Sequence, residues 1–491
     1  MFNLKIENFR SFKSEEFKFS KINILIGENS SGKSSLFKLI LAMKQTLQLP
    51  QSREINFSFS GGLSDLGSFR ESVYYHNDLL PMTIEFSVVK NYSNFFYNSF
   101  MVKEEDNLSE KAEEEKGKIR AYIGKDIQSF TKLRFVITKD LDRHDTISSV
   151  ISNPDLGEIE ISFPGQRKQN EEQERIFGPR CQLRYFDAQL DKTFLFEVEY
   201  QKEGFITLVL SESLLAQINK LLQIRQADVS DDNSNEEDFK KYPVAHTLYY
   251  RIAYLLVTQN FLKYYLDKVE YINPIFTRPS RVYLYRDEKN SLSVKDIEDV
   301  VEFFSSSSEF SRAVFKDFSR ILESFGIVEG FEVLKDDRLP VRELRVKIKD
   351  LVSNITDVGY GVSLQLPIIL KALISDKLKS RRNSILLIEQ PEVHLHPKLH
   401  AQLVEVLLSL SRYNTYFIET HSEHIIRKLQ ILVKEKRYNL KTDDITIHYL
   451  KRSNRKTEVT SHSIDENGFL APPLPMDFFD NSYLLAKDLL D

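Results

Sequence analysis

The segment from Gly27 to Ser34, Gly-Glu-Asn-Ser-Ser-Gly-Lys-Ser, constrains the fold of this chain more than any other stretch. It fits the pattern G-x-x-x-x-G-K-[ST], in which a loop joins a strand to a helix and points its backbone N–H groups at a phosphate. The apolar run from Ile22 to Ile26 has the composition of a buried strand, and apolar residues at helical spacing follow the loop. A plain turn rich in glycine and serine is the alternative, and this context disfavours it.

The loop predicts a site for the phosphates of ATP and for Mg²⁺. A lysine at the position of Lys33 reaches the β- and γ-phosphates, and a hydroxyl at the position of Ser34 binds the metal ion. The dipole of the following helix also favours an anion at this end. The residues predicted to bind the nucleotide here are Gly27, Asn29, Ser30, Ser31, Gly32, Lys33, Ser34 and Ser35.

Composition limits the classes of protein to which the chain can belong. With 491 residues, of which 41% are hydrophobic, it can form two or three compact units. The net charge of −5 provides no general basic surface, so DNA binding through a local patch is possible but is not indicated. The single cysteine, Cys181, excludes an internal disulfide, and no run approaches the roughly 18 apolar residues of a membrane helix. We therefore expect a cytoplasmic protein without a membrane partner.

The order of apolar and polar patterns predicts an interrupted α/β fold. Residues 1–95 read mostly as strands with one long helix, and residues 346–491 alternate between strands and helices, which implies a largely parallel sheet with flanking helices. The strands near the N-terminus are expected to form an antiparallel β layer. Residues 96–345 are predicted to be a large insertion of helices and strands, with an acidic mobile loop at 228–237.

A second motif supports the phosphate site. The apolar run from Ile385 to Ile388 ends in Glu389, which is the Walker B pattern of a buried strand followed by an acid. At the C-terminal edge of a parallel sheet, such a carboxylate can help to hold the Mg²⁺ that bridges the phosphates. The pattern alone is weak, but together with the loop it predicts Ser34 and Glu389 as the metal ligands.

Several stretches resemble one family of ATPases. The run from Ile388 to Pro397, Ile-Glu-Gln-Pro-Glu-Val-His-Leu-His-Pro, is similar to a signature of the OLD-like (overcoming lysogenization defect) ATPases, a branch of the ABC-type ATPases near RecF and SMC proteins. Four further stretches are also similar to that family: 8–12, 62–67, 357–367 and 419–422. The resemblance covers roughly residues 1–90 and 345–465, and it implies an ABC-type P-loop ATPase core.

The resemblance also implies that two copies of the chain build each site. The run from Gly359 to Ser363 matches the signature loop, which in such proteins contacts the γ-phosphate bound to the other protomer, and Gly361 and Ser363 are its expected nucleotide-binding residues. We therefore expect a homodimer or a higher homo-oligomer around sandwiched ATP. His421 matches the switch histidine that senses the γ-phosphate.

One position departs from the family pattern. Gln390 stands where ABC-type ATPases usually carry the glutamate that activates water, and glutamine can orient water but cannot accept its proton. We expect slow hydrolysis, with Glu392 able to act if its loop turns inward. The predicted catalytic residues are Glu389, Gln390, Glu392 and His421.

The family resemblance implies a role in bacterial anti-phage defence, in which the ATPase controls a separately encoded effector, either a nuclease or a toxin. Few residues follow His421, so we expect no Toprim nuclease domain after the ATPase core. Two alternatives stay open. The chain could be a DNA repair or clamp ATPase of the RecF or SMC type, or an assembly scaffold that binds ATP without hydrolysing it.

Overall fold

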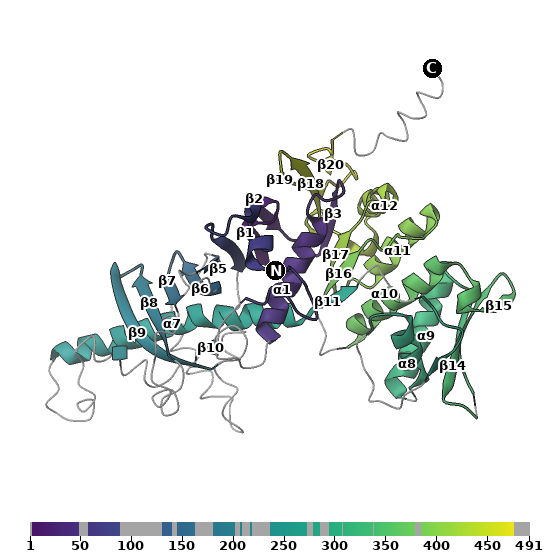
Figure 1. Cartoon of the computed structure of the whole chain (residues 1–491), viewed down its shortest axis with the longest axis horizontal. Helices are drawn as coiled ribbons and strands as arrows, with labels where there is room; N and C mark the ends of the chain where they lie inside the picture. The colour runs from purple at the N-terminus through teal and green to yellow at the C-terminus, as the bar shows by residue number, and fades with distance from the viewer. Residues whose placement is uncertain are drawn as a thin grey trace, which may run out of the picture. The chain divides into compact units, whose positions relative to one another are not determined.

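The structure is a computed structural model of the whole chain (Figure 1). The residues that it describes are 2–48, 57–88, 130–139, 145–162, 180–201, 207–208, 217–218, 236–272, 278–284, 294–306, 308–336, 338–378 and 384–475. They form two compact units, one of residues 1–18 with 38–267 and the other of residues 19–37 with 268–491. The chain therefore crosses from one unit to the other three times.

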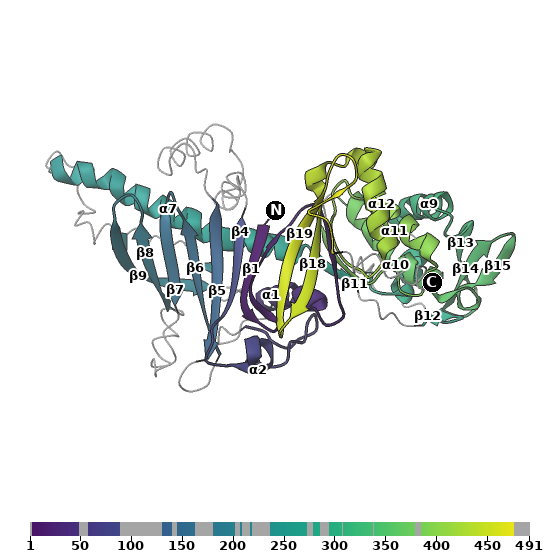
Figure 2. The same ribbon diagram turned by 90° about the horizontal axis from the view of Figure 1, so that it is seen from above.

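The first unit is built on a nine-stranded sheet in the order β10-β9-β8-β7-β6-β5-β4-β1-β2, with every neighbouring pair antiparallel. Its strands are β1 (Phe2–Phe9), β2 (Phe12–Lys18), β4 (Met82–Val88), β5 (Thr131–Lys139), β6 (Asp145–Asn153), β7 (Gly157–Ser162), β8 (Arg180–Asp187), β9 (Lys192–Gln201) and β10 (Thr207–Leu208). The long helix α7 (Glu236–Asp267) packs against β5 and β6 and runs across the strands (Figure 2). The short helix α2 (Phe69–Ser72) also belongs to this unit.

The second unit contains the sheet that carries the phosphate loop, in the order β11-β16-β17-β3-β18-β19-β20. Its strands are β3 (Ile22–Gly27), β11 (Val269–Ile272), β16 (Ile385–Glu389), β17 (Thr415–Glu419), β18 (Ile445–Ser453), β19 (Lys456–Ile464) and β20 (Leu470–Ala471). The five strands from β11 to β18 are parallel, and β18, β19 and β20 are antiparallel. All six residues of β3 are buried, as expected for a central strand covered on both faces.

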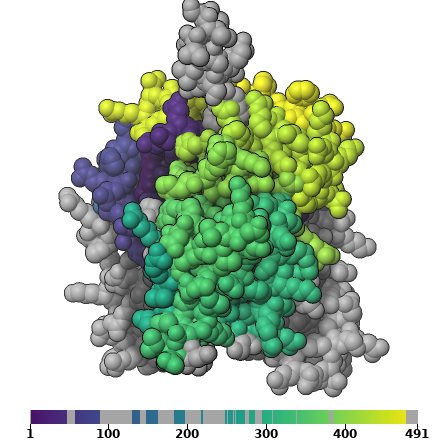
Figure 3. Space-filling view, turned by 90° about the vertical axis from the view of Figure 1, so that its right-hand side faces the viewer, coloured from purple at the N-terminus to yellow at the C-terminus, as the bar shows by residue number. Residues whose placement is uncertain are grey.

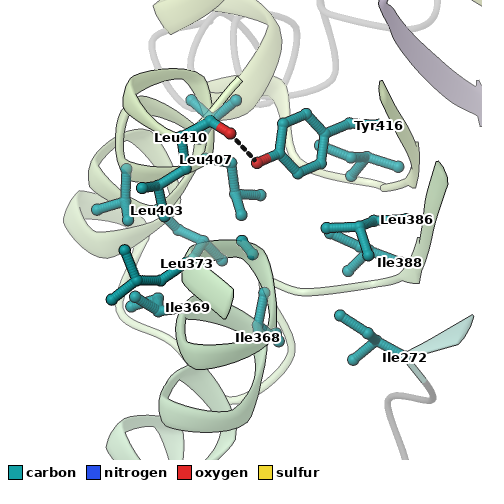
Figure 4. Packing of buried hydrophobic residues seen from close by; sticks show 14 of the residues in the cluster. Ile272, Ile368, Ile369, Leu373, Leu386, Ile388, Leu403, Leu407, Leu410 and Tyr416 are labelled. Atoms are coloured by element: carbon teal, nitrogen blue, oxygen red, sulfur yellow. Dashed lines mark hydrogen bonds between the residues drawn. The ribbon is translucent and has the colours of Figure 1, made fainter. Parts of the chain in front are cut away.

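Two helices cover one face of this parallel sheet. Leu373 of α10 (Tyr360–Lys377) and Leu403 of α11 (Pro397–Ser409) face the strand residues Leu386 and Ile388 (Figure 4). The hydroxyl of the buried Tyr416 donates to the carbonyl of Leu410 at 3.0 Å, which satisfies a polar group inside this apolar layer. Two further helices carry site residues: α1 (Lys33–Gln48), which starts in this unit and continues into the first, and α12 (Glu423–Lys434).

A smaller layer packs beside α10 and is drawn in green in Figure 3. It contains α8 (Ile297–Ser305), α9 (Glu309–Ser324), β12 (Tyr283–Leu284), β13 (Gly330–Lys335), β14 (Val341–Ile348) and β15 (Leu351–Asn354). The side chains of Asp296 and Ser308 cap the first turns of α8 and α9, so the sequence starts each helix locally. The rings of Phe304, Phe318 and Phe331 pack between the helices and β13.

The predicted α/β fold with a largely parallel sheet and an antiparallel β layer is confirmed. The division at 95 and 345 stays a prediction, although β11, which falls in the predicted insertion, pairs with β16 in the central sheet. Most of the predicted acidic loop at 228–237 lies outside the described residues, and its last two residues begin α7 instead. None of the helices in the described ranges is long and apolar enough to span a membrane.

Candidate nucleotide-binding site

The loop between β3 and α1 adopts a backbone that requires glycine at its two ends. Gly27 has φ 141° and Gly32 has φ 103°, values that residues with a Cβ rarely adopt. A Cβ on Gly27 would lie 2.0 Å from the carbonyl oxygen of Leu450, because β18 runs beside the end of β3. The glycines recognised in the sequence therefore serve the turn and its close packing.

The hairpin of β18 and β19 holds the loop from the other side. The Thr457 hydroxyl donates to the carbonyl of Ser31 at 2.7 Å, and the guanidinium of Arg452 donates to the carbonyl of Ser30 at 3.2 Å. These bonds fix the curve of the loop through residues more than 400 positions away in the sequence. The loop is thus shaped by the fold itself, which lowers the entropic cost of ordering it around a phosphate.

Lys33 lies inside the curve of the loop. Its ammonium donates to the carbonyls of Gly27 at 3.0 Å and Glu28 at 2.7 Å, and only 4% of the residue is exposed. Burial lowers the pKa of Lys33, while the negative charges of Glu419 and Glu28 oppose this shift. A buried ammonium within an anion-binding loop is the expected setting for a phosphate contact.

Glu419, at the end of β17, is a site residue that the sequence prediction did not include. The Ser34 hydroxyl donates to the two oxygens of its carboxylate, at 3.0 and 2.9 Å. The residue is 3% exposed, and burial, together with the charges of Glu389 and Glu392, raises the pKa of Glu419 to about 7 against the opposing effects of Ser34 and Lys33. The signal in the sequence was an acid two positions before His421 at the end of an apolar strand.

The predicted metal ligand Glu389 lies beside Glu419, because the two residues pair in register across β16 and β17. Tyr271 of β11 is hydrogen-bonded to Glu389, and burial, followed by the charge of Glu389, raises the pKa of the Tyr271 hydroxyl. The described residues contain no group of three or more His, Cys, Asp or Glu that could hold a metal ion alone. The hydroxyl and carboxylate oxygens at this edge nevertheless fit Mg²⁺, which commonly takes one or two carboxylates and completes its shell with phosphate and water.

The segment after β16 is tied to the end of β17. The N–H of Gln390 donates to the carbonyl of Glu419 at 2.7 Å, and Gln390 has φ 40°. One oxygen of the Glu392 carboxylate accepts from the Thr420 hydroxyl and from the N–H of His421, both at 2.7 Å. The other oxygen of Glu392 is buried and has no hydrogen-bond partner within the described part of the chain. The four predicted catalytic residues therefore come from two adjacent strand ends.

His421 begins the segment that leads into α12 and is exposed. Partial burial of its ring and the positive charge of Lys33 lower the pKa of His421 below its ordinary value of 6.5. The neutral imidazole therefore predominates at neutral pH, and it can donate one hydrogen bond and accept another.

The predicted signature residues lie at the start of α10. A Cβ on Gly361 would lie 2.7 Å from the carbonyl oxygen of His394, so the helix approaches the segment after β16 closely. Ser363 is 3% exposed, and its hydroxyl donates to the carbonyl of Tyr360 at 2.7 Å. This geometry does not favour Ser363 as a direct phosphate ligand. The exposed start of the helix is Gly359, and a Cβ added there would meet no atom within 4 Å from the described residues beyond its chain neighbours.

A phosphate-binding loop between a central parallel strand and a helix, with acids at the ends of neighbouring strands, defines a P-loop nucleotide-binding protein. The chain belongs to the AAA ATPase domain family, whose model matches residues 1–426. It is accordingly an ATP-binding protein of an ATPase family.

Three solved structures align with most of the chain at low sequence identity. An Smc head bound to the C-winged helix domain of ScpA has 12% identity and a TM-score of 0.40, covering 94% of this chain and 98% of that one. An SMC head domain from Thermotoga maritima has 9% identity and a TM-score of 0.33, with coverages of 93% and 97%. An Smc head with an extended coiled coil, bound to the C-terminal domain of ScpA derived from Pyrococcus furiosus, has 12% identity, a TM-score of 0.36 and full coverage of both chains. No curated protein matches the chain.

Proposed function

We propose that the chain is an OLD-like, ABC-type ATPase that binds ATP with Mg²⁺, hydrolyses it slowly and forms homodimers around two sandwiched nucleotides. The observation that carries this proposal is the arrangement at the phosphate loop. Lys33 lies within the curve of the loop, Ser34 lies in the first turn of α1, and Glu389 and Glu419 occupy the adjacent strand ends. Each of these groups matches the charge or the ligand preference of a magnesium-bound triphosphate.

Each residue of the site has a role in the proposed reaction. The loop N–H groups and Lys33 bind the β- and γ-phosphates. Ser34 and Glu389 would hold Mg²⁺, which when bound would neutralise negative charge on the phosphates. Gln390 orients the attacking water without accepting its proton, which keeps hydrolysis slow. The His421 ring contacts the γ-phosphate in this proposal, because His421 directly follows the end of β17, the strand beside β3, while its backbone N–H is donated to Glu392.

The proposed dimer completes each site with the α10 terminus of the second copy. The N-terminal end of a helix favours an anion, and the exposed Gly359 allows close approach of a partner's phosphate. The same terminus includes Gly361, which the family resemblance assigns to the signature loop. We propose that ATP joins two copies because it contacts the loop of one and the α10 terminus of the other.

In the proposed biological role, this nucleotide-dependent association controls a separately encoded nuclease or toxin in anti-phage defence. This part rests on the family resemblance in the run from Ile388 to Pro397. A DNA repair or clamp ATPase of the RecF or SMC type would use the same nucleotide site. Salt-sensitive binding of the isolated protein to DNA would favour that alternative, because phosphate contacts release counterions.

Steady-state phosphate release with Mg-ATP tests the proposed activity. We expect slow release by the wild type and none by Lys33→Ala, because the substitution removes the buried ammonium from the loop. Lys38→Ala is the matched control, since Lys38 lies on the same helix and is exposed. Tight ATP binding without phosphate release by the wild type would contradict hydrolysis and favour the non-hydrolysing scaffold.

A further inference from the structure

We propose that Glu419, in addition to Glu389, provides a carboxylate that positions Mg²⁺ at the phosphate loop. This inference rests on the proposed function, since it concerns the metal ion that accompanies the nucleotide. Glu419 is a positioning residue that acts through the hydroxyl of Ser34.

The hydrogen bond places Glu419 at the metal-binding hydroxyl. Ser34 Oγ lies 3.0 Å from Oε1 and 2.9 Å from Oε2 of Glu419. A serine that donates its proton to a carboxylate keeps both oxygen lone pairs for a metal ion. The hydrogen bond also makes the serine oxygen a stronger ligand for that ion. The contact therefore orients the Ser34 lone pairs for metal binding rather than competing with it.

The order of the strands places Glu419 nearer to the loop than Glu389. β17 lies directly beside β3, which leads into the loop, whereas β16 lies one strand further away. Neighbouring strands are about 4.8 Å apart, so the backbone of Glu389 is one strand spacing more distant. A metal ion on Ser34 has Glu419 as the carboxylate of the adjacent strand.

The local charge is negative and buried. Glu389 and Glu392 interact electrostatically with Glu419, and Lys33 is the cation that opposes them. Glu392 is 9% exposed, and one of its oxygens is buried with no hydrogen-bond partner among the residues that the structure describes. Buried carboxylates are stable when they are paired or coordinate a metal, and a divalent cation beside Ser34 supplies the missing positive charge.

Binding of Mn²⁺ to the full chain in the presence of a non-hydrolysable ATP analogue tests this role. Electron paramagnetic resonance counts the free Mn²⁺, so the readout does not depend on activity. We expect Glu419→Gln, which keeps an oxygen to accept from Ser34, to weaken Mn²⁺ binding by about tenfold or more, while binding of the metal-free analogue is unchanged. Glu419→Asp should restore part of the affinity.

Glu405→Gln is the matched control, because Glu405 is a buried glutamate that pairs with Lys428 on α12. It should bind Mn²⁺ as the wild type does. The melting temperature of metal-free Glu419→Gln should equal or exceed that of the wild type, because a charge next to Glu389 and Glu392 is removed. Wild-type affinity for Mn²⁺ in Glu419→Gln would overturn this inference alone. Failure of the wild type to bind the Mn²⁺ and analogue pair would overturn the proposed function.

Discussion

The backbone N–H of His421 donates to the carboxylate of Glu392 at 2.7 Å, and the same carboxylate oxygen accepts from the hydroxyl of Thr420. Through these bonds the segment after β16 holds the segment after β17. Glu392 is therefore placed to position His421, whereas the sequence alone suggests a catalytic role for Glu392 in place of the glutamate that is absent at Gln390.

Substitution of Glu392 separates positioning from proton transfer. Glu392→Gln keeps an acceptor for Thr420 and His421, so we expect steady-state phosphate release to fall only a few-fold. Glu392→Ala leaves the Thr420 hydroxyl and the His421 N–H without that acceptor, at a free-energy cost of about 1–3 kcal/mol. Phosphate release should therefore fall about tenfold or more. If both variants lost phosphate release completely, the negative charge of Glu392 itself would be required, as it is for a general base.

Gly27 is expected to tolerate no side chain. Because its Cβ would lie 2.0 Å from the Leu450 carbonyl at φ 141°, Gly27→Ala must displace β18 or the loop. We expect a loss of at least about 3 kcal/mol in the free energy of unfolding, measured by denaturant titration, and no detectable ATP binding. Gly62→Ala is the control, since no atom lies within 4 Å of its Cβ position, and it should behave like the wild type. Normal stability of Gly27→Ala would contradict this geometry.

The first unit contains a buried ion pair whose disruption should lower its stability. Asp187 is fully buried and binds the guanidinium of Arg251 on α7 at 2.9 Å. Arg251→Met leaves Asp187 as an uncompensated charge, so we expect the free energy of unfolding to fall by about 3–5 kcal/mol. Arg184→Met removes an exposed ion-pair partner that lies 3.8 Å from Glu160. This substitution should change the free energy of unfolding by less than about 1 kcal/mol. Similar effects of the two substitutions would be inconsistent with the buried pair.

Acid should destabilise the second unit through His448. Burial, and then the charge of His462, lower the pKa of His448 to about 4 in the folded chain. Between about pH 6.5 and pH 4 the unfolded state binds a proton that the folded state excludes. The stability that neutral His448 contributes is therefore fully present above pH 6.5 and is lost as the pH falls. The resulting decrease in the free energy of unfolding should approach about 3 kcal/mol at pH 4.

Thermal melting as a function of pH measures this effect. His448→Asn should show a flatter decline of melting temperature between pH 7 and pH 4 than the wild type, even if it melts lower at pH 7. His424→Asn, which changes an exposed histidine of the same unit, should follow the wild-type curve. A wild-type melting temperature that is constant over this range would contradict the buried neutral His448.

The local parts of the fold and the site were predictable because their signals are contiguous. The apolar strand, the glycine-bracketed loop and the first turn of α1 lie within residues 22 to 35, and their geometry is dictated by those residues themselves. The apolar strand that ends in Glu389 was predictable for the same reason. Such segments combine hydrophobic periodicity with obligatory glycines.

The remaining site residues depend on contacts that no local pattern encodes. Glu419 is recognisable only when β17 is known to lie between β16 and β3. Likewise, Thr457 and Tyr271 reach the site because β19 and β11 join the same sheet. The burial of Ser363 was not predicted, because a serine four positions into a helix can face either solvent or core, and the helical turn around Tyr360 directs its hydroxyl inward.

The central claim is that two copies of the chain build each nucleotide site. Lys33→Ala removes the loop ammonium, and Gly359→Arg places a bulky side chain at the exposed start of α10, where an added Cβ meets no atom of the described residues within 4 Å. Each variant alone should release no phosphate from ATP. In a mixed dimer, one site combines the intact loop of one copy with the intact helix terminus of the other.

An equimolar mixture of the two variants tests this claim most directly. If dimers exchange at random in the presence of ATP, half of them are mixed and each has one intact site, so phosphate release should recover to about a quarter of the wild-type rate. A mixture that stays as inactive as its components, or full activity of Gly359→Arg alone, would contradict a site shared between two copies.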